Sequence, residues 1–129
     1  MTEMRVRQLC PRLVVSDARR AIEFYRRALG AEETMRYAGK DGTVAHAELD
    51  LGGFILAVKD ESEDDPSPTS LGGTPVQVGM RVTDVDAAAQ AMVAAGATVV
   101  LPIADRPYGQ RDGRLADPFG HIWVLSQQI

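Results

Sequence analysis

Few side chains in this sequence could carry out acid–base or covalent chemistry. The 129 residues include one cysteine, Cys10, and two histidines, His46 and His121. His46 and Glu48 stand two residues apart in an alternating segment, so both side chains would share a strand face. They could act there as an acid–base pair or ligate a metal, although a solvent-facing polar pair has the same spacing. Nothing in the sequence activates Cys10 as a nucleophile, and we name no catalytic residue.

The second histidine follows a turn. The segment LADPFGHIWVLS places Pro118 and Gly120 where a tight turn needs a preset and a permissive backbone. His121 then begins a strand three residues before Val124, so these two side chains face opposite sides of the sheet. We therefore expect a structural role for His121 and helix packing for Trp123.

Two segments have the periodicity and end signals of amphipathic helices. Asp17 is placed to cap the first and Gly30 to end it, and Asp84 and Gly96 stand at the same places in the second. Each helix is preceded by one predicted strand and followed by three. The helices are expected at 17–30 and 84–96, and the strands at 8–16, 33–39, 44–51 and 54–60 and at 76–83, 97–103, 110–116 and 121–127.

This repeated order predicts an α+β fold of two βαβββ modules. We expect one domain over residues 1–129, with module one at 5–60, an acidic linker at 61–74 and module two at 75–129. Each curved mixed sheet would carry its helix on the convex side. The concave sides would surround a cleft of the kind that small molecules occupy.

Composition limits the partners. The net charge is −4 at pH 7, and residues 60–70 hold five of the 18 acidic residues. No basic stripe of the kind found in nucleic-acid-binding proteins stands out. No apolar run reaches the roughly 20 residues of a membrane helix, and the N-terminus lacks a signal-peptide pattern. A single cysteine cannot form an internal disulfide, which favours the cytoplasm. We therefore expect a cytoplasmic protein, and from the charge and hydropathy patterns one that binds neither nucleic acid nor membranes.

Both helix segments and the last two strands are similar to a known family. They read LVVSDARRAIEFYRRALGAE, MRVTDVDAAAQAMVAAGA and YGQRDGRLADPFGHIWVL. Together they resemble the vicinal oxygen chelate superfamily, which includes glyoxalase I, extradiol dioxygenases and bleomycin-resistance proteins. The last segment, with AHAELDLGGFILAVKDE, is most similar to the PhnB-like or bleomycin-resistance-like branch. The resemblance implies the two-module fold but no particular activity, because this fold hosts many chemistries.

Enzymes of this superfamily generally bind a divalent metal ion through His and Glu side chains on the first and fourth strands of each module. Matched residue by residue, those positions are Cys10, Leu56, Gln77 and Val124, or Ala57 for Leu56 if the register shifts by one. Leucine and valine have no donor atom, and a thiol with a neutral amide suits such an ion poorly. These replacements predict no metal ion and no cofactor.

The concave faces supply further candidates for ligand binding. Tyr108, in a turn flanked by glycine and proline, would stack on a flat ligand or pack at the rim. Arg12 and Arg81 could meet a ligand oxygen or ring. If the modules pair between the chains of a homodimer, Tyr37 of one protomer and Tyr108 of the other could meet.

The leading hypothesis is a metal-free homodimer that sequesters a hydrophobic, aromatic natural product, as bleomycin-resistance-type members do. The alternative is a metal-dependent lyase, isomerase or dioxygenase of the glyoxalase type with an atypical site that uses His46 and Glu48. The predicted ligand-binding residues are Cys10, Arg12, Tyr37, His46, Glu48, Leu56, Gln77, Gly79, Tyr108 and Val124.

Overall fold

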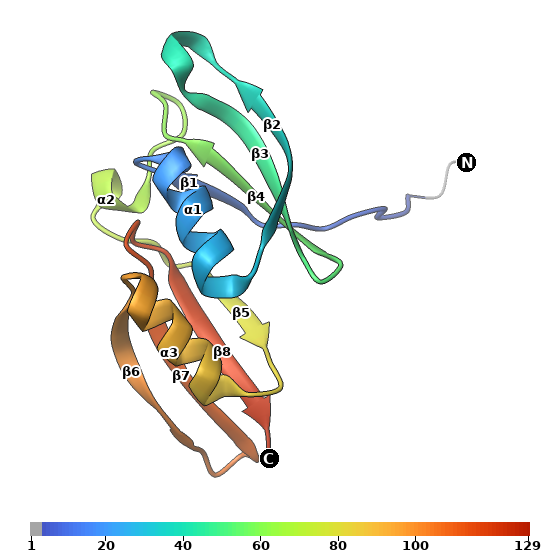
Figure 1. The fold of residues 1–129 in the computed structure, drawn as a ribbon, viewed down its shortest axis with the longest axis vertical. Coiled ribbons are helices and arrows are strands. Elements are labelled where there is room, and N and C mark those ends of the chain that lie inside the picture. The colour runs from blue at the N-terminus through green and yellow to red at the C-terminus, as the bar shows by residue number, and fades with distance from the viewer. Residues whose placement is uncertain (1–3) are drawn as a thin grey trace.

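The computed structural model describes residues 4–129 and divides them into two modules of the same topology (Figure 1). Module one comprises β1 (Arg12–Val15), α1 (Ala18–Leu29), β2 (Glu32–Ala38), β3 (Val44–Leu51) and β4 (Phe54–Asp60). Module two comprises β5 (Gln77–Arg81), α3 (Val85–Ala95), β6 (Thr98–Asp105), β7 (Gln110–Ala116) and β8 (Ile122–Gln128). The short helix α2 (Pro68–Leu71) lies between them, and the 3-10 turn η1 (Lys40–Gly42) joins β2 to β3.

The strands form two four-stranded sheets, in the orders β1-β4-β3-β2 and β5-β8-β7-β6. In each sheet the first strand is parallel to its neighbour and the other pairs are antiparallel. Both sheets are therefore mixed, and the predicted α+β fold of two βαβββ modules is confirmed.

The helix ends form where local chemistry places them. The side chain of Asp17 accepts a hydrogen bond from the backbone N–H of Arg20 at the start of α1. Gly30, with φ 68°, ends that helix in the left-handed conformation that glycine tolerates best. Asp84 caps α3 in the same way through the N–H of Ala87.

Each sheet packs one face against helix. From β1, Leu13 and Val15 point toward α1 and are 4% and 0% exposed. From β8, Trp123 and Leu125 are 2% and 0% exposed. The ring of Trp123 lies 5.7 Å from that of Tyr25 on α1, centroid to centroid, so the predicted packing of the tryptophan against a helix is confirmed.

A buried carboxylate joins the modules where α1 packs against α3 (Figure 1). Asp117, in the turn between β7 and β8, is 4% exposed and accepts a hydrogen bond from the hydroxyl of Tyr25 at 2.6 Å. It also accepts from Nε1 of Trp123 at 3.0 Å and from the backbone N–H groups of Phe119 and His121 at 2.9 and 3.0 Å. One side chain therefore ties a helix of module one to a turn of module two.

His121 makes a second link between the modules. Its Nε2 lies 2.8 Å from the carbonyl oxygen of Val14 on β1, and the residue is 9% exposed. The ring and the backbone N–H of His121 both form structural hydrogen bonds, in agreement with the structural role expected from the turn.

The N-terminal arm and the acidic linker differ in their contacts with the two modules. Residues 4–11 extend outward as an arm, and β1 is therefore shorter than the predicted strand (Figure 1). Part of the acidic linker is ordered: Glu61 accepts hydrogen bonds from the hydroxyls of Ser70 and Ser67, which hold the pKa of its carboxyl below the usual value. Within residues 4–129, no helix is long and apolar enough to cross a membrane.

Candidate functional site

The face of the first sheet opposite α1, here called face one, gathers most of the polar side chains predicted for module one. Strand register places four of the predicted ligand-binding residues on it, together with four neighbours. These residues are Arg12, Val14, Met35, Tyr37, His46, Glu48, Ala57 and Lys59. Face one is therefore a polar surface with a small apolar centre at Ala57.

His46 and Glu48 contact each other on face one. Nε2 of His46 lies 2.9 Å from Oε2 of Glu48, and both side chains are 29% exposed. An imidazole within hydrogen-bond distance of a carboxylate has the geometry of a general acid–base unit. Among the residues that the structure describes, no group of three His, Cys, Asp or Glu side chains could hold a metal ion.

Two cations flank this pair. Arg12 donates from Nη2 to the carbonyl oxygen of Ala45 at 3.5 Å, across β4. Lys59 is 8% exposed and forms a close ion pair with Asp65 of the linker, while it also donates to Oγ of Ser62. The hydrogen bond from Lys59 holds the pKa of the Asp65 carboxyl below its usual value.

The structure corrects the placement of Leu56. This residue pairs with Leu49, is 3% exposed and belongs to the core on the helix side of the sheet. Ala57, which pairs with Arg12 and Glu48, holds the position on face one. Leu56, Ala57 and Val58 are all apolar, so alternation along β4 could not mark which side each faces. Cys10 precedes β1 and is partly exposed.

The corresponding surface of the second sheet, face two, lies opposite α3. Gly79 and Gln77 on β5 are exposed, with Val124 beside Gly79 on β8 and Arg114 beyond it on β7. No heavy atom outside its chain neighbours would lie within 4 Å of a Cβ built on Gly79. Face two is thus open at Gly79 and Val124, and the side chains around them are polar: Gln77, Arg81 and Arg114.

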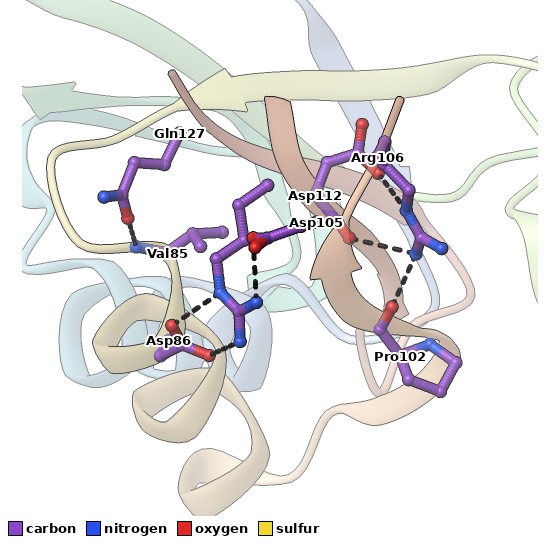
Figure 2. A network of polar contacts seen from close by, with 8 residues as sticks. Val85, Asp86, Pro102, Asp105, Arg106, Asp112 and Gln127 are labelled. Atoms are coloured by element: carbon purple, nitrogen blue, oxygen red, sulfur yellow. Dashed lines mark hydrogen bonds and ion pairs between the residues drawn. The ribbon is translucent and has the colours of Figure 1, made fainter. Parts of the chain in front are cut away.

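Tyr108 lies at the border of face two, in the turn between β6 and β7. Its hydroxyl donates to Oδ2 of Asp112 at 2.5 Å, which raises the pKa of the tyrosine and lowers that of the carboxyl. Arg106 donates from Nε to Oδ1 of the same carboxylate at 2.9 Å and from Nη2 to the carbonyl of Pro102 at 2.7 Å (Figure 2). Tyr108 as a residue is 65% exposed. It is therefore fixed at its hydroxyl end and accessible at its ring.

Faces one and two are not brought together within one chain. The modules pack mainly through α1 and α3, and each helix covers the other side of its own sheet. Arg12 and Tyr37 on face one and Gln77 and Gly79 on face two are all exposed. The predicted ligand-binding residues therefore form two groups on separate surfaces.

The four positions at which the resemblance implies metal ligands do not suit a metal ion here. With the corrected register they carry Cys10, Ala57, Gln77 and Val124. Alanine and valine have no donor atom, and a thiol with a neutral amide does not make the imidazole–carboxylate set that a divalent ion needs. The absence of a bound metal ion stays a prediction.

A cavity of about 760 Å³, here called the seam cavity, lies between the modules beside the edge strand β5. Its walls come from the arm, the end of α1, the β3–β4 hairpin, β5 and β8, and are mainly apolar. They include Leu29, Leu51, Phe54, Val78, Met80 and Trp123. Two predicted site residues, Leu56 and Gly79, border this cavity.

Two features of the site had no sequence signal that could have found them. The segment DPFG predicted a turn at Asp117, but nothing in it indicated that the Asp117 carboxylate would be buried against Tyr25. The seam cavity depends on how the arm, the hairpin and β5 come together. Arg106 and Asp112, which hold Tyr108, are six residues apart and could have been suspected only from their opposite charges.

Comparison with known proteins identifies the family. The model of the Glyoxalase/Bleomycin resistance protein/Dioxygenase superfamily matches residues 6–125. The uncharacterized protein Rv0887c of Mycobacterium tuberculosis strain H37Rv is 47% identical over 126 residues, which cover 94% of this chain and 74% of that protein.

Solved structures agree with this match. TioX from Micromonospora sp. ML1 is 33% identical with a TM-score of 0.74, over 95% of this chain and 98% of that one. A superfamily member from Sphaerobacter thermophilus DSM 20745 has a TM-score of 0.77 at 24% identity, over 98% of this chain and 100% of that one, which shows the shared fold. This chain belongs to the glyoxalase/bleomycin resistance protein/dioxygenase superfamily.

Proposed function

We propose that this protein binds and sequesters a small hydrophobic, aromatic molecule in the cytoplasm without transforming it. Face two carries the proposal. Gly79 leaves open space beside Val124, and the exposed ring of Tyr108 is held in place by its hydrogen bond to Asp112. A fixed aromatic ring at the border of a face that is open at Gly79 suits stacking on a planar ligand, which contributes about 0.5–1.5 kcal/mol per ring pair. The bleomycin resistance proteins in the family's description agree with this function.

The binding site is completed in a homodimer, in which face one of each protomer meets face two of the other. A ligand pocket usually buries 70–90% of its ligand's surface, which one open sheet face cannot do. A two-fold axis would form two equal clefts from the four faces.

An acid–base enzyme is the second candidate. It is supported by the contact of 2.9 Å between His46 and Glu48 on a surface that would line the same cleft. In that case His46→Ala and Glu48→Gln would abolish conversion of a ligand that still binds. In the sequestration proposal, the ligand is recovered unchanged from every variant.

Native mass spectrometry with bleomycin and doxorubicin as probes tests the proposal. We expect a dimer that takes up one or two molecules of a probe and releases them with unchanged mass. A leucine side chain at position 79 would fill the open space, so Gly79→Leu should lower probe affinity at least tenfold. Tyr108→Ala should lower it about fivefold, and the control Val93→Ala, on the exposed side of α3, should leave it unchanged.

Two results would overturn sequestration. The first is a monomer that binds neither probe in the native spectra. The second is a changed ligand mass that depends on His46, which would favour the enzyme.

A further inference from the structure

We propose that the seam cavity, which shares Gly79 and Arg81 with face two, is itself a ligand site and that it takes an amphipathic monoanion. The ligand would have an apolar body, which fills the space between the modules, and one carboxylate or similar group, which pairs with Arg81. This proposal does not depend on sequestration at the sheet faces.

The shape and lining of the cavity suit an apolar body. Its volume of about 760 Å³ falls within the 300–1,000 Å³ that is typical of small-molecule sites. Trp123 is 2% exposed on its wall, whereas Phe54 on the β3–β4 hairpin is 79% exposed. An apolar molecule held between the modules would cover the phenyl ring of Phe54 and remove that surface from water.

Arg81 supplies the charge. It is the one charged side chain among the described residues that line the cavity. No hydrogen bond or ion pair to another described residue occupies its guanidinium, whereas Arg106 and Arg111 of the same module are both held by carboxylates. A guanidinium pairs with a carboxylate through two parallel hydrogen bonds. Arg81 is exposed, so its side chain is accessible to such a group.

A straight-chain fatty acid and an aromatic acid both combine an apolar body with one carboxylate. Three probes distinguish the kind of apolar body from the contribution of the charge. Dodecanoate and 1-naphthoate both carry one negative charge on an apolar body. Dodecanol has the chain of dodecanoate without the charge. Trp123 is the single tryptophan of the chain and lines the cavity, so its fluorescence reports occupancy directly.

Fluorescence titration of the full-length protein is expected to give three results. At least one of the two acids binds tenfold or more tightly than dodecanol. Arg81→Gln removes most of this preference and leaves dodecanol binding unchanged, while Arg20→Gln, on the exposed side of α1, changes neither. Phe54→Ala weakens the acid and the alcohol alike, by about threefold. The acid that binds more tightly identifies the kind of apolar body.

Other results would overturn the proposal. Equal affinity for dodecanoate and dodecanol, or no effect of Arg81→Gln, would show that no anion site exists. If neither acid changes Trp123 fluorescence and Phe54→Ala dissociates a dimer in sedimentation velocity, a second copy of the chain occupies the cavity instead.

Discussion

Removing the Asp117 carboxylate is the most direct test of how the modules are held together. It accepts four hydrogen bonds, from Tyr25, Trp123 and two backbone N–H groups, at 2.6–3.0 Å. Each buried donor left unsatisfied costs about 1–3 kcal/mol, although water that enters the vacated space offsets part of this loss. We expect Asp117→Ala to lower the free energy of unfolding by about 3–5 kcal/mol, because several buried donors lose their acceptor.

Tyr25→Phe is the milder change. It removes one hydrogen bond to a charged acceptor and keeps the ring that packs on Trp123, so we expect a loss of about 1.5–3 kcal/mol. In the Asp117→Ala background the same substitution should cost much less, because its acceptor is already gone.

Urea unfolding followed by Trp123 fluorescence, at one protein concentration, measures these changes. Tyr37→Phe is the matched control, since Tyr37 is 59% exposed, and it should stay within about 0.5 kcal/mol of the parent. If Tyr25→Phe changes the free energy of unfolding no more than this control, and Asp117→Ala changes it by less than about 1 kcal/mol, the network does not hold the modules together.

Three further predictions follow from local contacts. Burial, and next the charge of Asp117, raise the pKa of Tyr25 above its ordinary value of 10.0. The protonated form is therefore favoured in the folded state, so its stabilisation is complete below pH 10 and is lost as the pH rises further. Tyr25→Phe should remove that loss in urea unfolding at pH 9–11.5. Gly113→Ala would place a Cβ 2.6 Å from the carbonyl oxygen of Leu101, so we expect thermal unfolding to show a loss of about 1–3 kcal/mol, and an unchanged melting temperature would contradict this contact. Asp17→Ala removes the cap of α1 and should cost about 1 kcal/mol in urea unfolding, whereas Asp17→Asn should keep most of the stability.

Local patterns predicted the elements well because their causes are local. Helix caps such as Asp17 act on backbone groups within one turn, and strand alternation such as Val78 and Met80 is a property of neighbouring residues. The same reasoning failed at Leu56, because a strand segment that is apolar on both sides shows no alternation of polar and apolar residues that would tell which side each residue faces. The His46–Glu48 contact could be predicted since both residues lie on one strand, two positions apart.

The sequence by itself determined the two-module repeat, the helix ends and the structural place of His121. These depend on residue type and on spacing within one element or one repeat. Only the tertiary structure decided that α1 packs on α3 and leaves faces one and two on separate surfaces, and that Asp117 is buried against Tyr25. It also decided that Arg81 borders an apolar cavity. Each of these depends on contacts between segments far apart in the chain. Many side chains together set the geometry of such contacts, and no short sequence pattern indicates that geometry.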